Sequence, residues 1–318
     1  MVLLAQAELI PANLRLSPLI SGRDIAFVSD LNLFLRQMGQ KELSRVVSLD
    51  SLRSTSPVMQ IPSQNRSWAW FTYFFRMSGQ PMYGIMEGIQ YSLDKTVDHL
   101  NTLEAEELSR VCAGLPDQAA IGLLQRLNSP VVLSLKEISD PRVEHLASFD
   151  ALAAQRVNVY RLHESLPRAY FVNGVEQASS HADAMRRFLR SDFAYDRNVI
   201  LENGPPVEMQ GRTTAGKASV VNYANNHVVS EVKAQVPGYL VLLDSYYPGW
   251  RAYVDGVEVR ILRANYAFRA VQVGAGNHRV EFIYRPRSFY LGLWVSSVAL
   301  FSGVVSLFWC PRHKVSGR

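Results

Sequence analysis

The feature that most constrains this chain is an uninterrupted apolar run near its C-terminus. Residues 289–310, FYLGLWVSSVALFSGVVSLFWC, contain no charged residue and no proline. At ~1.5 Å per residue, a helix of this length crosses the roughly 30 Å hydrocarbon core of a bilayer. Tyr290, Trp294 and Trp309 lie near its ends, where interfacial aromatic residues are expected. The run predicts one transmembrane helix over residues 287–311, with the lipid bilayer as its partner.

Basic residues flank this span on both sides. Two arginines precede it, and Arg312, Lys314 and Arg318 follow it. This small excess favours a cytoplasmic tail over residues 312–318. The orientation needs other support, because so small a difference is a weak signal.

The N-terminal stretch, MVLLAQAELIPANLRLSP, has no Lys or Arg before Arg15. It therefore lacks the basic start of a signal peptide. Taken alone, the chain would be tail-anchored with its body in the cytoplasm. If Met1 to Leu4 are instead the exit of a preceding membrane helix, the body lies on the other side.

Residues 1–200 predict an α+β region with an α/β-like alternation of helices and strands. Thr102 and Asp117 are suited to cap two successive helices that end near residue 128. Ser180 and Asp183 form a plausible capping box for a third. Short apolar runs predict strands at 25–28, 45–49, 131–135, 157–162 and 169–172.

Residues 201–286 change character after the ENGPP sequence at 202–206, which is the expected domain boundary. Apolar residues alternate with polar ones over 228–236, and further strand-like runs recur about every 8 to 12 residues. Asp255-Gly256 fits a two-residue hairpin turn, and Pro248-Gly249 a second turn. We predict an antiparallel β-sandwich here.

Several functional classes are disfavoured by composition. The formal charge is +5 and the sequence pI about 9.2, but the basic residues are scattered, so no nucleic-acid partner is expected. The 7 histidines and 2 cysteines show no metal-ligand spacing, and GAGNH at 274–278 is not a phosphate loop. We therefore predict no metal and no cofactor. The acidic run at 104–107 is interpreted as a solvated first helical turn.

The sequence YYPGWRAYVDG at 246–256 is the candidate binding segment. Aromatic rings can cover sugar faces, and a charged pair can fix hydroxyl or phosphate groups. One wall of such a groove would use Asp244, Tyr246, Tyr247, Trp250 and Arg251, and the opposite wall Arg263, Asn265, Tyr266 and Arg269. Turn and core roles explain the same residues without a ligand, and we favour a core role for Trp250.

Residues 246–292 also resemble the C-terminal signature of the bacterial YfhO-type membrane proteins. A PGW-x-A-x-VDG turn, an RAN-x-AFRA strand, a GxH-x-VEF-x-Y strand and a final membrane helix occur here in the family's order. SLPRAYFV at 165–172, LLQRLNSPVVLS at 123–134 and AELIPANLRLSP at 7–18 are similar to upstream family segments. The resemblance covers nearly the whole chain and is strongest from residue 165 on.

The resemblance implies the architecture of GT-C glycosyltransferases, which transfer sugars from polyprenyl-phosphate donors on the extracytoplasmic side. The chain would then be the extracytoplasmic accessory portion and last membrane helix of such an enzyme in the bacterial cytoplasmic membrane, with upstream membrane helices as partners. Catalytic acidic residues of that architecture lie in a first extracytoplasmic loop, so no catalytic residue is assigned here. The rival interpretation is a membrane-anchored, non-catalytic module that binds an envelope glycan or another protein.

Overall fold

The computed structural model describes residues 28–42, 45–53, 77, 88–93, 102–150, 156–202 and 216–309. Its helices are α3 (Asp30–Glu42), α4 (Leu49–Leu52), α7 (Leu103–Gly114), α8 (Asp117–Leu124), the 3₁₀ helix η4 (Gln125–Leu127), α9 (His181–Leu189) and α10 (Arg287–Trp309). The first seven strands are β1 (Val46–Ser48), β2 (Val131–Ser134), β3 (Val143–Asp150), β4 (Arg156–Leu162), β5 (Ala169–Val172), β6 (Gly174–Ala178) and β7 (Asn198–Glu202). The remaining strands are β8 (Gly216–Ala224), β9 (His227–Ala234), β10 (Gly238–Ser245), β11 (Trp250–Val254), β12 (Val257–Val259), β13 (Leu262–Ala264), β14 (Phe268–Val273) and β15 (Gly276–Tyr284).

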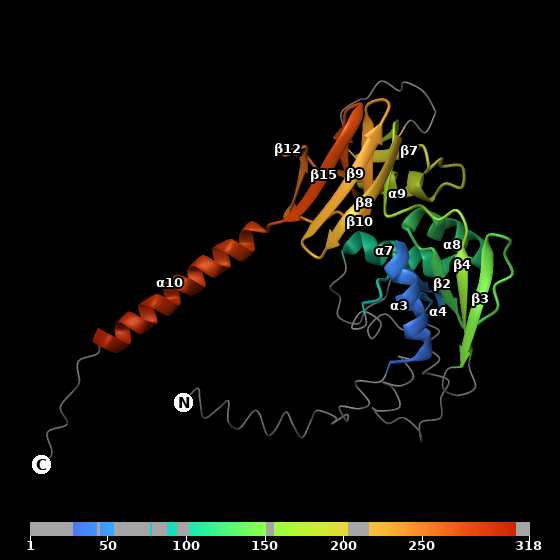
Figure 1. The fold of residues 1–318 in the computed structure, drawn as a ribbon, viewed down its shortest axis with the longest axis horizontal. Coiled ribbons are helices and arrows are strands. Elements are labelled where there is room, and N and C mark those ends of the chain that lie inside the picture. The colour runs from blue at the N-terminus through green and yellow to red at the C-terminus, as the bar shows by residue number, and fades with distance from the viewer. Residues whose placement is uncertain are drawn as a thin grey trace, which may run out of the picture.

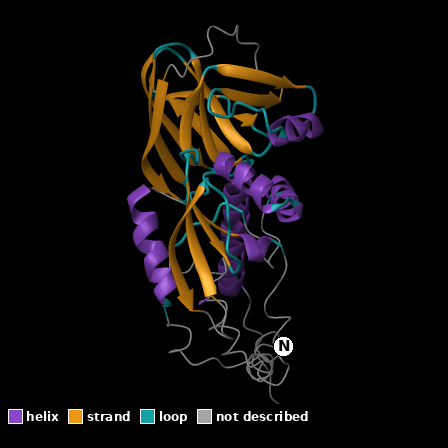
Figure 2. Cartoon of the chain, turned by 90° about the vertical axis from the view of Figure 1, so that its right-hand side faces the viewer, coloured by secondary structure: helices purple, strands orange, loops and turns teal. Residues whose placement is uncertain are grey.

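The N-terminal sheet has the strand order β1-β2-β4-β3. On one face, Leu31 and Leu35 of α3 pack against Val131 and Val159. On the other face, Val132 and other residues share a core with α7 and α8. Figure 2 shows this small sheet beneath the larger β-structure, with helices beside it and between the two.

The central sheet has the order β5-β10-β14-β13-β7-β6, and β10 explains how it is buried. Tyr239, Val241 and Leu243 face the core that contains α7 and α8. Leu240 and Leu242 face a second core, because successive side chains of a strand point to opposite sides. A strand covered on both faces needs apolar residues at every position, which accounts for the unbroken YLVLL sequence.

The outer sheet, β12-β11-β15-β9-β8, packs on the second face of the central sheet. Phe282, Val280 and Ala252 of the outer sheet meet Leu240 and Phe171 of the central sheet. These two sheets form the β-sandwich, so the expected α+β fold with a sandwich is confirmed. The pairing is antiparallel throughout the outer sheet, whereas β6 and β7 of the central sheet run parallel, with α9 as their crossover.

The central sheet joins strands from both sides of the boundary predicted at residue 200. β5 pairs with β10, and β13 pairs with β7. Strands β3, β6 and β7 had no counterpart among the predicted strands. The residues at the boundary itself, 203–215, and most of the strand predicted at 25–28 lie outside the described ranges.

Helix capping follows the sequence prediction in two of three cases. Thr102 Oγ1 accepts from the Ala105 N–H, and Ser180 Oγ from the Asp183 N–H at 3.1 Å. Asp117 does not cap. It is the first residue of α8, after Pro116, and its carboxylate pairs with Arg53 at 2.5 Å. Pro116 occupies the N-cap position and has no side-chain acceptor for the first helical N–H groups, so α8 begins without a side-chain cap.

Helix α10 leaves the body of the molecule as a single rod (Figure 1). Residues Arg287–Val305 have a mean hydropathy of 1.6, and none of this stretch is buried against the rest of the protein. A helix that is apolar on all sides and has no protein cover matches a bilayer-spanning segment. The predicted transmembrane helix thus has its structural counterpart in α10.

Candidate functional site

The turns of the YYPGWRAYVDG segment have the predicted form. Asp255 and Gly256 have φ values of 50° and 83°, as the central positions of a type I′ hairpin require. Gly249 has φ 101°, and its carbonyl oxygen accepts from the Arg285 N–H at 2.7 Å. The second turn is therefore tied to the residues that lead into α10.

Trp250 is half-buried, between core and solvent. It packs against the sandwich core, and its ring centroid lies 5.3 Å from that of Tyr284. The guanidinium carbon of Arg269 lies 4.0 Å from the Trp250 ring centroid, a cation–π contact. Trp250 thus closes the edge of the core and also presents surface to an adjoining cleft.

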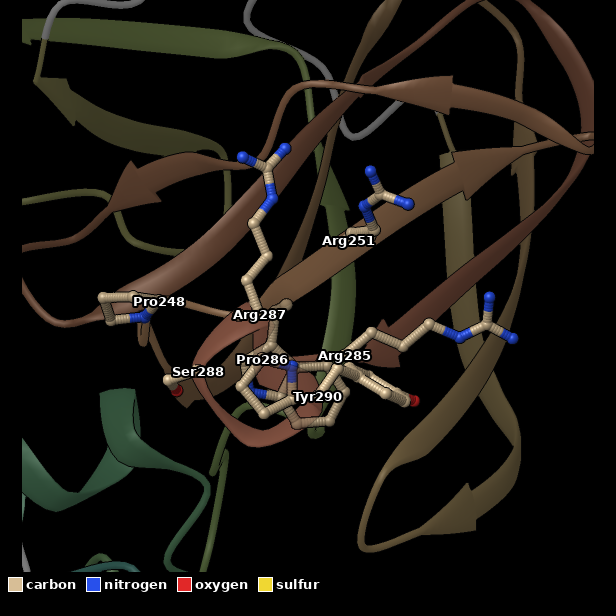
Figure 3. A pocket seen from close by; sticks show the side chains of 9 residues that line it. Pro248, Arg251, Arg285, Pro286, Arg287, Ser288 and Tyr290 are labelled. Atoms are coloured by element: carbon tan, nitrogen blue, oxygen red, sulfur yellow. The ribbon is translucent and has the colours of Figure 1, made fainter. Parts of the chain in front are cut away.

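This cleft has a volume of about 780 Å³ and lies between the Pro248-Gly249 turn of the sandwich and the first turn of α10. It is called the interface cleft below, because it lies where the sandwich meets the helix. Its lining residues are Pro248, Gly249, Trp250, Arg251, Arg285, Pro286, Arg287, Ser288 and Tyr290. Figure 3 shows the side chains of Arg251, Arg285 and Arg287 extending in different directions from the part of the chain around Pro286 and Tyr290. No acidic side chain lines the cleft; Arg251 pairs at 3.2 Å with Glu258, which lies outside it. Three guanidinium groups beside two aromatic rings can bind an anion that carries an apolar or planar part.

A second group of charges lies inside the protein, behind Trp250. The Asp244 carboxylate is buried and pairs with Arg45, with Arg168 at 2.8 Å and with Arg269 at 3.1 Å. These four residues are called the arginine cluster below. Gln90 and the hydroxyl of Tyr223 accept further hydrogen bonds from Arg168.

The arginine cluster carries more positive than negative charge. Burial would raise the pKa of Asp244, but the three arginines outweigh burial and hold that pKa below its ordinary value. Burial lowers the pKa of Arg269 to about 10, so this group stays charged at neutral pH. The Nε and Nη1 atoms of Arg269 are buried without a hydrogen-bond partner. One carboxylate therefore faces three buried guanidinium groups.

The cluster joins parts of the chain that are far apart in sequence. Arg45 precedes β1, Arg168 precedes β5, and Asp244 is on β10, 199 residues after Arg45. Sequence reasoning identified Asp244 and Arg269 but missed Arg45, Arg168 and Tyr223. No local pattern distinguishes these residues from exposed ones, because their burial depends on the packing of three sheets.

The nine predicted ligand residues lie in separate places. Asp244 and Arg269 are in the arginine cluster, and Trp250 and Arg251 line the interface cleft. Tyr247 is 52% exposed, beside Tyr284. Contacts nevertheless join the two predicted walls, because Arg269 meets Asp244 and Trp250, and Arg263 lies over the Tyr246 ring.

Of the other four predicted residues, Arg263 lies on the inner strand β13, and the rest lie just after the ends of β10 and β13. Arg263 stacks on the Tyr246 ring at 4.8 Å. Tyr266 stacks on His181 at 4.4 Å. Asn265 is buried and structural, because its amide accepts from the Ile200 N–H and donates to the Tyr170 hydroxyl, both at 2.8 Å.

In the acidic run at 104–107, Glu106 and Glu107 are exposed as predicted, and Glu104 is half-buried. Glu104 pairs with Arg263 at 2.7 Å, and Glu107 accepts from the Tyr266 hydroxyl. Glu106 contacts Arg110 at 3.3 Å. The first turn of α7 thus fastens the helix to the central sheet, which a single-helix pattern does not reveal. Among the residues that the structure describes, no group of His, Cys, Asp and Glu is arranged to hold a metal ion.

Comparison with known proteins locates the family signal. The sequence model of the family described as bacterial membrane protein YfhO matches residues 209–296. The uncharacterized protein YfhO of Bacillus subtilis (strain 168) is 28% identical over 127 residues, which are 40% of this chain and 14% of that protein. Residues 209–296, called the YfhO-type region below, are thus similar to a region of bacterial membrane proteins of this family.

The YfhO-type region contains the outer sheet, the Pro248-Gly249 turn, the interface cleft and the start of α10. The matched segment spans about 14% of the Bacillus subtilis relative, so the chain corresponds to a small part of that protein's length. No solved structure matches the chain. The start of α10, the candidate membrane helix, lies inside the matched residues.

Proposed function

We propose that this chain is the extracytoplasmic accessory portion of a GT-C-type membrane glycosyltransferase that uses a polyprenyl-phosphate sugar in cell-envelope glycosylation. In this proposal the bulk of the chain lies outside the bacterial cytoplasmic membrane and the tail lies inside. The catalytic residues come from membrane segments upstream of those described. The sandwich covers the active site or holds the acceptor glycan.

The observation that carries the proposal is the short link between the sandwich and the membrane helix. Only Arg285 and Pro286 separate β15 from α10, and the Arg285 N–H is bonded to Gly249 of the sandwich. Such a link holds the sandwich close to the bilayer surface, where a lipid-linked sugar would be processed. The YfhO match runs through this link. This supports a shared role in the family for the sandwich and the start of α10 together.

The acceptor is proposed to contact the exposed aromatic edge of the sandwich. Tyr247 is half-exposed beside Tyr284, and Arg263 lies over the neighbouring Tyr246 ring. Aromatic faces next to a guanidinium suit a saccharide that carries hydroxyl or acidic groups.

The test uses membranes from bacteria that express the chain within its whole reading frame. Transfer of radiolabelled sugar from a polyprenyl-phosphate donor to envelope polymer is measured for the wild type and Tyr247→Ala. We expect the variant to raise the KM for the acceptor about tenfold, the upper range for loss of one aromatic contact. Val257→Ala, which trims another exposed side chain of the outer sheet, is the matched control and should leave KM unchanged.

Absence of transfer in wild-type membranes, together with glycan binding by the purified chain, would favour the rival interpretation. The chain would then be a membrane-anchored binding module without a catalytic role. The exposed Tyr247 ring favours this second function equally, because an aromatic surface holds a glycan with or without chemistry nearby.

A further inference from the structure

The interface cleft combines positive charge with a position at the membrane surface. Arg285 lies two residues before α10, and Arg287 is the first residue of the helix. Both side chains are exposed, and within the described residues neither has an Asp or Glu at ion-pair distance. Two guanidinium groups without a protein counter-charge are available to an anion from outside the protein.

The position of the cleft relative to the bilayer follows from α10, whose first turn forms one side of the cleft. Tyr290 also lines the cleft and lies one turn into α10, about 5 Å along the helix axis from Arg287. Tyrosine and arginine at the start of a membrane helix lie at headgroup level, with the apolar stems toward the acyl chains. The cleft therefore opens where lipid phosphates are concentrated.

The arginine cluster adds a second layer of positive charge. Arg269 lies 4.0 Å from the ring of Trp250, and Trp250 lines the cleft. The cluster has one carboxylate for three guanidinium groups, and it is surrounded by apolar core that screens charge poorly. Its excess charge raises the potential in the cleft and favours an anion there.

We propose that the interface cleft binds the phosphate of an anionic phospholipid headgroup, with Arg285 and Arg287 as its counter-charges and with Trp250 and Tyr290 beside it. The bound headgroup fixes the height and tilt of the sandwich above the bilayer. The size of the cleft, about 780 Å³, is within the range of small-molecule sites and exceeds what a single phosphate needs. This site does not depend on a glycosyltransferase activity, because it uses only the charge and position of the cleft.

The experiment measures lipid binding to the full chain in mild detergent by native mass spectrometry. Phosphatidylglycerol, phosphatidylcholine and inorganic phosphate are titrated separately. We expect wild-type protein to bind phosphatidylglycerol more tightly than phosphatidylcholine. The double variant Arg285→Gln/Arg287→Gln should lose about thirtyfold in affinity for phosphatidylglycerol, since each basic residue near a lipid surface contributes about a factor of five.

The matched control is Arg110→Gln/Arg156→Gln, which removes the same charge from two exposed sites outside the cleft. Its affinity should change less than about twofold. Circular dichroism confirms that both double variants fold, as expected for substitutions of exposed side chains. If both double variants lost affinity for phosphatidylglycerol equally, binding would depend on the overall surface charge, and the assignment of the site to the interface cleft would be wrong. If an equal concentration of inorganic phosphate displaced phosphatidylglycerol, the proposal that the ligand is a lipid would be wrong.

Discussion

Asp244 illustrates how one buried carboxylate organises its surroundings. Its oxygens accept charge-assisted hydrogen bonds from three arginines that belong to different parts of the fold. Each charge costs several kcal/mol to remove from water, so the group is tolerated only because the partners face one another. Removal of the carboxylate would leave three buried cations with no counter-charge.

We therefore predict that Asp244→Asn destabilises the chain by about 3–5 kcal/mol, the usual cost of breaking a buried ion pair from one side. Asp150→Asn removes a carboxylate from an exposed pair with Arg156 and should cost less than about 1 kcal/mol. Urea unfolding followed by circular dichroism measures both. Similar losses for the two variants would contradict the buried-cluster argument.

His278 and Asp255 form a smaller charged pair at the end of the outer sheet. Hydrogen bonding from His278 Nδ1 to the Asp255 carboxylate, at 2.7 Å, raises the pKa of His278. Hydrogen bonds from the Arg279 N–H and then from His278 lower the pKa of Asp255. The stabilisation from His278 is complete below its unfolded pKa of about 6.5 and is lost as the pH rises through the raised folded value. The stabilisation from Asp255 is present above about pH 4 and is lost below it.

The pair should consequently stabilise the chain most between about pH 4 and 6.5. We predict that His278→Gln lowers the melting temperature more at about pH 5.5 than at about pH 8.5. His145→Gln, at an exposed position in β3, serves as the control. A melting difference for His278→Gln that is the same at both pH values would refute the assigned pair.

At the scale of elements, two glycine turns differ in what surrounds them. Gly249 and Gly256 both have positive φ, which L-residues with a Cβ adopt at a cost. A Cβ on Gly249 would lie 2.9 Å from Tyr284 Cε2 and 3.1 Å from Pro286 Cβ, whereas one on Gly256 would meet nothing within 4 Å. The first turn is confined by the entry to α10, and the second is open.

We predict that Gly256→Ala costs about 1–2 kcal/mol from backbone strain alone. Gly249→Ala should cost more, about 3 kcal/mol, because the added methyl group also displaces Tyr284 or Pro286. It should also weaken phosphatidylglycerol binding at the interface cleft, while Gly256→Ala should not. Thermal unfolding and the lipid titration separate these effects, and equal behaviour of the two variants would argue against a confined first turn.

At the scale of the whole molecule, the chain is a series of layers attached to a membrane helix. The N-terminal sheet, the helices α7 and α8, the central sheet and the outer sheet follow one another, and two shared cores join them. The outer sheet leads directly into α10. Only Arg285 and Pro286 separate the sandwich from this helix.

The proposed orientation places the sandwich outside and the basic tail inside the cytoplasmic membrane. With the upstream reading frame present, a green fluorescent protein fused after Arg318 should fluoresce, and alkaline phosphatase at the same point should be inactive. The positively charged tail favours retention on the cytoplasmic side. The opposite pair of results would invert the proposed topology.

The sequence alone determined the features that depend on residues close together in the chain. The length and apolarity of residues 289–310 specified α10, Asp255-Gly256 specified its hairpin turn, and Thr102 and Ser180 specified helix starts. Period-two alternation likewise marked β9. Each of these depends on chemistry within a few residues, so the sequence alone was sufficient.

Only the tertiary structure decided which distant segments meet. β5 lies beside β10 across the boundary predicted at residue 200, and Arg45 reaches Asp244 from 199 residues away. The interface cleft exists because a turn after β10 packs on the start of α10. The nine predicted ligand residues were chosen for their chemistry, whereas the contacts of Arg269 with Asp244 and Trp250 follow from strand order and the packing of the two sheets. Strand order and burial are properties of packing over long sequence separations, which no local pattern encodes.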